Sequence, residues 1–201
     1  AWRAPYTNFL ASAEQSFFDE IAEAMGVDRV QLHMDLLENV KGTTDDRIQY
    51  SPERLQGVIK KVVQESNWGK AQNGVFQGFA VYYCHNTHVA EVADVVMDNG
   101  IPVVKKVTCA VDCGIVVNPT GAKNQVVGGI IDGIGHMMYG ELKFVDGVPQ
   151  ANNFDSYQLI RMNQTPTEVD VHFIENEIAP TGLGEPALPP VGGAVANAIY
   201  A

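Results

Sequence analysis

The 201-residue sequence has few cysteines, few basic side chains relative to acidic ones, and no long uncharged apolar run. Its three cysteines, Cys84, Cys109 and Cys113, are too few for a disulfide framework and are expected to be core thiols. Thirteen basic and twenty-four acidic side chains give a net charge of -11, which argues against nucleic acid or anionic membrane as a partner. No apolar run reaches the roughly 20 residues that cross a bilayer, so no membrane span is expected.

A zinc module is the alternative interpretation of the cysteines. Cys84-His85-x-x-His88 and Cys109-x-x-x-Cys113 group residues of ligand type, but neither half has a standard zinc-finger spacing. In an extended strand, neighbours such as Cys84 and His85 point to opposite faces, which weakens a shared ligand set. The sequence therefore favours core packing for these thiols.

The length allows one domain or two small ones, and the apolar content of 46% is enough for a real core. The chain does not begin with Met and has no signal-peptide pattern at its start. It ends inside a predicted helix, residues 191–201, without a Gly or Asn that would close it. We expect this chain to be the C-terminal piece of a longer polypeptide and to contact the rest of that polypeptide.

Residues 1–70 are expected to be helical. Apolar periodicity predicts helices over 9–25, 30–37 and 52–66, with Asp28 capping the second and Ser51 the third. Residues 71–201 form a sheet-rich part. Strands are predicted over 75–83, 89–97, 103–111, 141–145, 148–150 and 168–174, with helices over 122–139 and 191–201.

Asp98-Asn99-Gly100 and Asp146-Gly147 each predict a hairpin turn between two of these strands. Helices followed by turn-linked strands, without βαβ alternation, indicate an α+β fold with a mixed, mostly antiparallel sheet and packed helices. No linker is long enough to separate the helical part from the sheet-rich part, so residues 1–201 are taken as a single piece.

Glu185 lies in the most informative segment of the chain. It stands between Gly184 and Pro186, ahead of an apolar helix of small residues. Glycine lets a backbone approach a ligand closely, and proline fixes the direction of the chain. This pattern suits a carboxylate that enters a tight pocket as a catalytic base, the alternative being a Pro/Gly-rich connection with an incidental Glu.

The predicted helix 122–139 carries glycines at positions 128, 129, 133 and 135. Each costs about 1 kcal/mol relative to Ala in a helix interior, so four together need a reason. Close approach is that reason, and the partner is either a flat ligand, with the Gln125 amide beside it, or another backbone packed on the helix.

Arg3 and Asp132 are two further charged residues to place. Arg3, beside Pro5, has the geometry to fork onto an anionic ligand or a carboxylate, although an Arg near a chain end is usually a surface charge. Asp132 is expected to face solvent.

Four segments together resemble one family. They are Trp-Arg-Ala-Pro5 with Glu-Gln-Ser-Phe-Phe-Asp-Glu-Ile-Ala22 after it, Cys-Ala-Val-Asp-Cys-Gly-Ile-Val-Val-Asn-Pro119, Asn-Gln-Val-Val-Gly-Gly-Ile-Ile-Asp-Gly-Ile-Gly135 and Gly-Leu-Gly-Glu-Pro-Ala-Leu-Pro-Pro190. The chain is similar to the molybdenum-binding subunit of the xanthine dehydrogenase and aldehyde oxidase superfamily. Its nearest branch is the isoquinoline 1-oxidoreductase beta-subunit type, and the fold implied is the C-terminal part of the molybdenum cofactor-binding domain.

The resemblance implies roles for six residues. Glu185 becomes the general base beside molybdenum, in an oxidation of an N-heterocycle or aldehyde by an oxygen that comes from water. Gln125 and the Gly128-Gly129 backbone would contact the pterin, Arg3 would lie near the metal and the substrate, and Gly184 would lie at the cofactor. No residue of this chain is assigned as a metal ligand.

The resemblance also implies partners. The cofactor is expected to be molybdenum-molybdopterin cytosine dinucleotide, the substrate a small molecule, and the iron-sulfur clusters are expected on a partner subunit, since this chain has no cluster-type cysteine set. The branch favours the periplasm. The isolated piece is expected to fold but to turn over nothing, and the alternative is a non-catalytic binding or scaffold domain that kept this fold.

Overall fold

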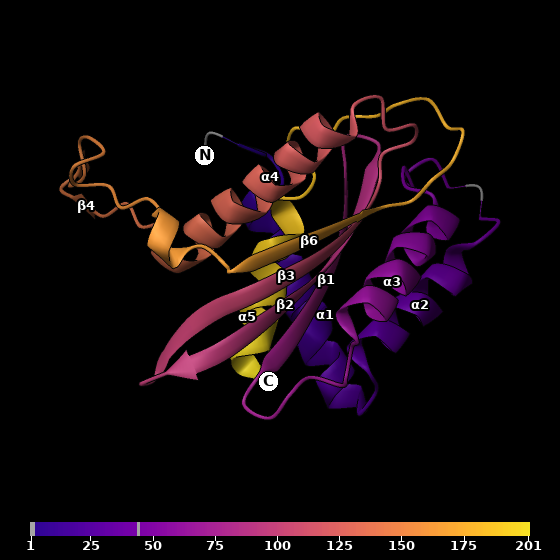
Figure 1. Ribbon diagram of the computed structural model, residues 1–201, viewed down its shortest axis with the longest axis horizontal. Coiled ribbons are helices and arrows are strands. Elements are labelled where there is room, and N and C mark those ends of the chain that lie inside the picture. Colours follow the sequence, from indigo (N-terminus) through magenta and orange to yellow (C-terminus); the bar gives the residue numbers. More distant parts are fainter. Residues whose placement is uncertain (1–2, 44) are drawn as a thin grey trace.

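A computed structural model describes residues 3–43 and 45–201 and confirms the α+β fold (Figure 1). Trp2 of the Trp-Arg-Ala-Pro opening lies outside the described residues. The helices are α1 (Asn8–Met25), α2 (Arg29–Val40), α3 (Pro52–Ser66), α4 (Pro119–Tyr139) and α5 (Pro189–Tyr200), with a 3-10 turn at Met162–Gln164. The strands are β1 (Phe76–Cys84), β2 (Thr87–Asp98), β3 (Ile101–Asp112), β4 (Phe144–Val145), β5 (Val148–Pro149) and β6 (Glu168–Phe173).

The main sheet has the strand order β1-β2-β3-β6. The first three strands are antiparallel, and β6 pairs with β3 in parallel. The predicted turn at Asp98-Asn99-Gly100 is present, with Asn99 and Gly100 both in the left-handed region. The small β4-β5 hairpin extends away from the body at the far end of α4 (Figure 1).

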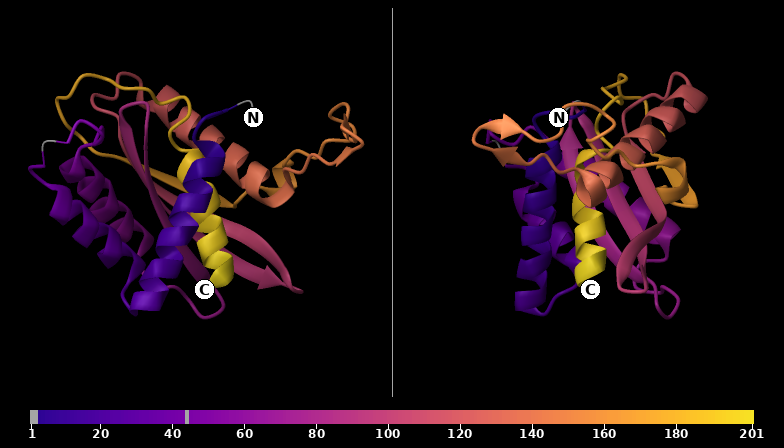
Figure 2. Two further views of the ribbon diagram at one scale, coloured as in Figure 1. Left: turned by 180° about the vertical axis from the view of Figure 1, so that it is seen from behind. Right: turned by 90° about the vertical axis from the view of Figure 1, so that its left-hand side faces the viewer.

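Helices cover both faces of the main sheet. α3 and α2 lie on one face, where Val58, Ile59 and Val62 pack against Phe79 and Val92. The other face packs against α5 and α4, and α1 runs beside α5 (Figure 2). Each sheet face therefore buries its own apolar cluster, which explains why the β2 and β3 sequences read as nearly continuous apolar runs.

The edge strand β1 is closed off by two buried amides. The Val81 N–H donates to Gln15 Oε1 of α1 at 2.9 Å, and the Phe79 carbonyl accepts from Asn197 Nδ2 of α5 at 3.0 Å. The same Asn197 amide also reaches the Gln15 carbonyl at 3.3 Å. An edge strand with unpaired N–H and C=O groups is a template for aggregation, and these two side chains satisfy one N–H and one C=O group of this edge.

The glycine stripe of α4 is mainly a packing surface for the start of α5. A Cβ added at Gly133 would lie 2.2 Å from Val191 Cγ1 and 2.8 Å from the Leu188 carbonyl oxygen. A Cβ at Gly129 would lie 3.4 Å from the Ala187 Cβ. The sequence left two candidates for the close partner of this helix, a flat ligand or another backbone. At Gly129 and Gly133 the partner is another backbone segment.

We predict that Gly133→Ala destabilises the chain by about 1–3 kcal/mol, because overlap with the Leu188 backbone outweighs the gain in helix propensity. Gly57→Ala in α3 is the matched control, since a Cβ there meets no atom within 4 Å. It is expected to stabilise the chain by about 1 kcal/mol. Urea unfolding measures both, and a stabilising Gly133→Ala would contradict this packing.

Glu91 is a carboxylic acid fully buried in the centre of the sheet. Its Oε1 accepts a hydrogen bond from the Cys109 thiol on the neighbouring strand at 3.5 Å, and its Oε2 has no partner among the described residues. Burial raises the pKa of Glu91 well above its usual value, and the thiol contact offsets this only in part. Burial likewise raises the pKa of Cys109. Both shifts favour the protonated, neutral form of these groups in the folded chain.

Glu91→Gln should remove a pH-dependent loss of stability. Because the pKa of Glu91 is higher in the folded state than in the unfolded state, wild-type stability falls as pH rises above about 4.5, by up to about 1.4 kcal/mol per pH unit from this group. The amide of the variant is neutral in both states. Urea unfolding between pH 5 and 8 should show that the free energy of unfolding of the variant rises relative to that of the wild type as pH increases. If the two free energies change in parallel with pH, the assignment is contradicted.

Candidate functional site

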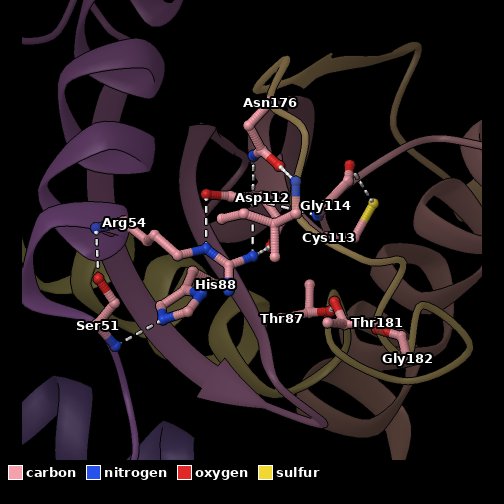
Figure 3. Close-up of polar contacts among 11 residues, drawn as sticks. Ser51, Arg54, Thr87, His88, Asp112, Cys113, Gly114, Asn176, Thr181 and Gly182 are labelled. Carbon is pink, nitrogen blue, oxygen red and sulfur yellow. Dashed lines mark hydrogen bonds and ion pairs between the residues drawn. The ribbon is translucent and has the colours of Figure 1, made fainter.

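The segment of residues 174–185 crosses one end of the main sheet and carries Glu185. Three of its backbone N–H groups are tied to that end: Ile174 donates to Val111, Thr181 to Cys113 at 2.9 Å, and Gly182 to His85 at 3.2 Å. The Thr87 hydroxyl donates to the Gly182 carbonyl and lies 2.6 Å from the Thr181 hydroxyl oxygen (Figure 3). The path of this segment is therefore set by the β1–β2 turn and by the end of β3.

Asp112, the last residue of β3, is the polar centre of this region (Figure 3). Its carboxylate accepts from the Arg54 guanidinium of α3 at 2.8 and 2.9 Å, from Asn176 at 2.8 Å, and from the Gly114 N–H at 3.2 Å. Burial alone would raise the pKa of Asp112, but these hydrogen bonds outweigh it and the net pKa lies below the usual value.

Gly114 follows directly and is confined by the same segment. Its φ is +71°, and an added Cβ would lie 2.5 Å from the Ala179 carbonyl oxygen. Only glycine fits a left-handed position this close to another backbone. The Cys-Ala-Val-Asp-Cys-Gly run thus holds the 174–185 segment through Asp112 and Gly114, while Cys109 and Cys113 are buried thiols.

Asp112→Asn should destabilise the chain by about 3 kcal/mol, because it leaves the largely buried Arg54 guanidinium without its counter-charge. Since the pKa of Asp112 is lowered in the folded state, its contribution is present above about pH 4 and is lost at more acid pH. The difference from the wild type should therefore shrink below that pH. Asp45→Asn, which breaks the exposed pair with Arg47, is the control and should change nothing measurable in urea unfolding.

His88 lies beside this centre and is buried. Its Nε2 accepts from the Ser51 N–H at 3.0 Å, so the ring proton sits on Nδ1, which has no partner among the described residues. Burial lowers the pKa of His88 to about 4, with Arg54 adding to the effect. His88 is a neutral acceptor at the start of α3.

Glu185 is bound to the β1–β2 turn. Its Oε2 lies 2.7 Å from His85 Nε2, and its side chain is 32% exposed. The Leu188 N–H donates to the Glu185 carbonyl at 2.9 Å, which joins the Gly-Glu-Pro turn to the start of α5. The carboxylate is thus held on one side and reachable on the other.

Arg3 joins three parts of the chain. Its Nε donates to the Gly184 carbonyl at 2.8 Å, its Nη1 to Asp132 at 2.8 Å, and its Nη2 to the Gln125 carbonyl at 2.9 Å and to Gln125 Oε1 at 3.3 Å. The Arg3 side chain is only 18% exposed, so it is not a free surface charge. The expectation from the sequence that Asp132 faces solvent did not include this ion pair with Arg3.

Of the six predicted site residues, the structure brings Gln125, Gly128 and Gly184 together around the Arg3 guanidinium. Gly128 faces it, since an added Cβ would lie 3.2 Å from Arg3 Nη1. Gln125 and Gly184 bind it, and Glu185 is the next residue along the chain. Gly129 is the exception, because it packs against Ala187 and Leu188.

His85 and Asp132 are polar partners of this site that the sequence did not reveal. Asn86, a turn-type residue between two predicted strands, was the available signal for a tight turn there. His85 and Asn86 both have positive φ, at 52° and 60°. The zinc interpretation is not supported by the side-chain directions, since His85 contacts Glu185, Cys109 contacts Glu91 and His88 contacts Ser51.

Within residues 3–43 and 45–201, no group of three His, Cys, Asp or Glu side chains forms a metal site. In the same part of the chain, no helix combines the length and the apolar character needed to cross a membrane.

The residues around Arg3 fit a flat hydrogen-bonding cofactor. The exposed Gln125 amide offers donors and an acceptor, and the Arg3 guanidinium, paired with Asp132, holds it in place. A Cβ at Gly184 would meet no atom within 4 Å, so the backbone is open beside Glu185. A pterin ring matches this set.

The sequence of residues 13–166 matches the molybdopterin cofactor-binding domain family, and the chain belongs to it. This confirms the family expected from the sequence motifs.

Two relatives cover most of the chain. It is 32% identical to the isoquinoline 1-oxidoreductase subunit beta of Brevundimonas diminuta over 92% of its length, which is 23% of that protein. It is 31% identical to the membrane-bound aldehyde dehydrogenase (pyrroloquinoline-quinone) of Gluconacetobacter polyoxogenes, again over 92% of its length and 25% of that protein. The chain thus spans about a quarter of the length of these relatives.

A solved structure, the aldehyde oxidoreductase of Desulfovibrio gigas, shares the fold. It aligns with 60% of this chain and 15% of its own, with a TM-score of 0.51 and 20% identity.

Proposed function

We propose that this chain is part of a molybdenum-dependent oxidoreductase that oxidises an N-heterocycle or an aldehyde with an oxygen from water, and that Glu185 is its general base. The family supports a molybdopterin cofactor, and two relatives are named for isoquinoline and aldehyde oxidation. The observation that carries the proposal is that Arg3 binds Gly184 and Gln125 and faces Gly128, while Glu185 directly follows Gly184 in the chain. When bound, the molybdenum-pterin group supplies the two-electron redox chemistry.

The residues of this chain have separate tasks in the proposal. Gln125 and the Gly128 backbone bind the pterin, while Arg3, neutralised in part by Asp132, fixes Gly184 against α4. Glu185 presents its carboxylate at the open side of Gly184 and takes the proton of the attacking water-derived oxygen. The remaining walls belong to the rest of the parent polypeptide.

The finer parts of the proposal concern cofactor and partners. We propose the cytosine dinucleotide form of the cofactor and an iron-sulfur partner subunit that receives the electrons. One relative has pyrroloquinoline-quinone in its name, but the matching family is described by molybdopterin, and the proposal follows the family. The alternative is a non-catalytic binding domain that kept this fold.

Metal and cofactor analysis of the complete, natively expressed protein separates these cases. Molybdenum with a pterin dinucleotide is expected. Pyrroloquinoline-quinone in its place, or no cofactor after expression with the maturation system, would overturn the proposal.

Glu185→Gln in the complete protein should lower kcat for N-heterocycle or aldehyde oxidation by at least about 100-fold, because a general base of this kind contributes roughly 10²- to 10⁴-fold. Molybdenum content should stay near that of the wild type. Glu177→Gln, an exposed carboxylate of the same segment, is the control and should keep full activity. Turnover retained by Glu185→Gln would remove this residue from its assigned role.

A further inference from the structure

The β1–β2 turn places a histidine directly beside Glu185. The turn consists of His85 and Asn86, and the backbone of both residues is in the left-handed region. His85 Nε2 and Glu185 Oε2 are 2.7 Å apart, although the two residues are 100 positions apart in the sequence.

The backbone around this contact is fixed on both sides. The Gly182 N–H donates to the His85 carbonyl, and the Thr87 hydroxyl donates to the Gly182 carbonyl. An added Cβ at Gly182 would lie 2.8 Å from the His85 Cβ, so the segment can pass the turn only with glycine here. The backbone that carries the His85 ring therefore cannot shift independently of the segment that carries Glu185.

The contact uses one carboxylate oxygen only. Among the described residues, Glu185 Oε1 has no hydrogen-bond partner, while Oε2 is taken by the imidazole. A neutral imidazole donates through one nitrogen, so a proton on Nε2 directs that hydrogen bond to Oε2. The side chain is thereby held in one orientation, and Oε1 remains for an incoming proton.

We propose that His85 is a positioning residue for Glu185: its Nε2–H holds Oε2 and aims Oε1 at the reacting atom. This inference rests on the proposed function of Glu185 as general base. His85 is not itself assigned a proton-transfer step. A misplaced catalytic group can lose a large part of its effect even when it is chemically intact.

Two substitutions separate the hydrogen bond from the rest of the side chain. Asn tolerates the left-handed backbone at position 85 but is too short to reach Glu185. Gln carries its amide nitrogen near the place of Nε2. In the complete, cofactor-loaded protein, His85→Asn should lower kcat about tenfold with KM changed less than about twofold, and His85→Gln should restore most of the loss.

Asn86→Gly is the matched control for the turn, since Asn86 contacts Tyr83 rather than Glu185. It should leave kcat unchanged. An equal loss in Asn86→Gly would show that only turn integrity matters. An equal loss in His85→Gln would show that the imidazole acts by its own chemistry. Either result overturns the positioning role.

A double-mutant cycle tests whether His85 acts through Glu185. In the Glu185→Gln background, His85→Asn should cause no further loss, because the group to be positioned is gone. If the fold losses in kcat of the two single variants multiply in the double variant, the inference is overturned.

A readout without turnover comes from NMR of the complete, cofactor-free protein with isotope-labelled histidine. His85 should carry a ring proton on Nε2 in the wild type. Glu185→Leu should shift its tautomer signals, whereas Glu177→Leu should not. Unchanged signals in Glu185→Leu would overturn the contact itself.

The two proposals fail in different ways. If Glu185→Gln stays active, the function assigned to Glu185 fails. If Glu185→Gln is inactive but His85→Asn turns over like the wild type, the general-base role stands and only the inference about His85 fails.

Discussion

The hydrogen bonds that tie the 174–185 segment to the sheet end are the constraint on which the site depends. This segment has no regular secondary structure before α5, so its own backbone does not fix its path. Asp112, Thr87 and the His85 carbonyl supply that path from the β1–β2 turn and the adjoining strand ends, which come much earlier in the chain. Because the sheet is rigid, the position of Glu185 is set by the sheet rather than by its neighbours in sequence.

Arg3 is the second group that fixes the position of the Gly-Glu-Pro turn, through its hydrogen bond to the Gly184 carbonyl. A guanidinium has five N–H donors in a rigid fork, and here it satisfies carbonyls of Gly184 and Gln125 together with the Asp132 carboxylate. Glycine at 128 leaves room for that fork against α4. The N-terminal segment, the glycine helix and the Gly-Glu-Pro turn are thus linked at one charged group, which explains why motifs so far apart in the sequence occur in one site.

Local sequence patterns predicted most of the elements. The caps Asp28 and Ser51 and the Asn99-Gly100 turn act through contacts within a few residues, and all three are present as predicted. Helix α4 begins at Pro119 rather than at residue 122, because Asn118 caps it through the Gly121 N–H. The strand predicted over 141–145 is shortened to β4, since it lies on a hairpin that pairs only with β5.

The sequence by itself determined the α+β class and the family, and it singled out Glu185 and the glycine helix as candidates, since these follow from short-range periodicity and from motifs contiguous in the chain. Tertiary structure alone decided that Gly129 and Gly133 pack against Ala187, Leu188 and the start of α5, that Asp132 pairs with Arg3, and that His85 meets Glu185. Each of these contacts joins residues brought together only by strand pairing and helix packing, and no local preference specifies which distant group a side chain will meet.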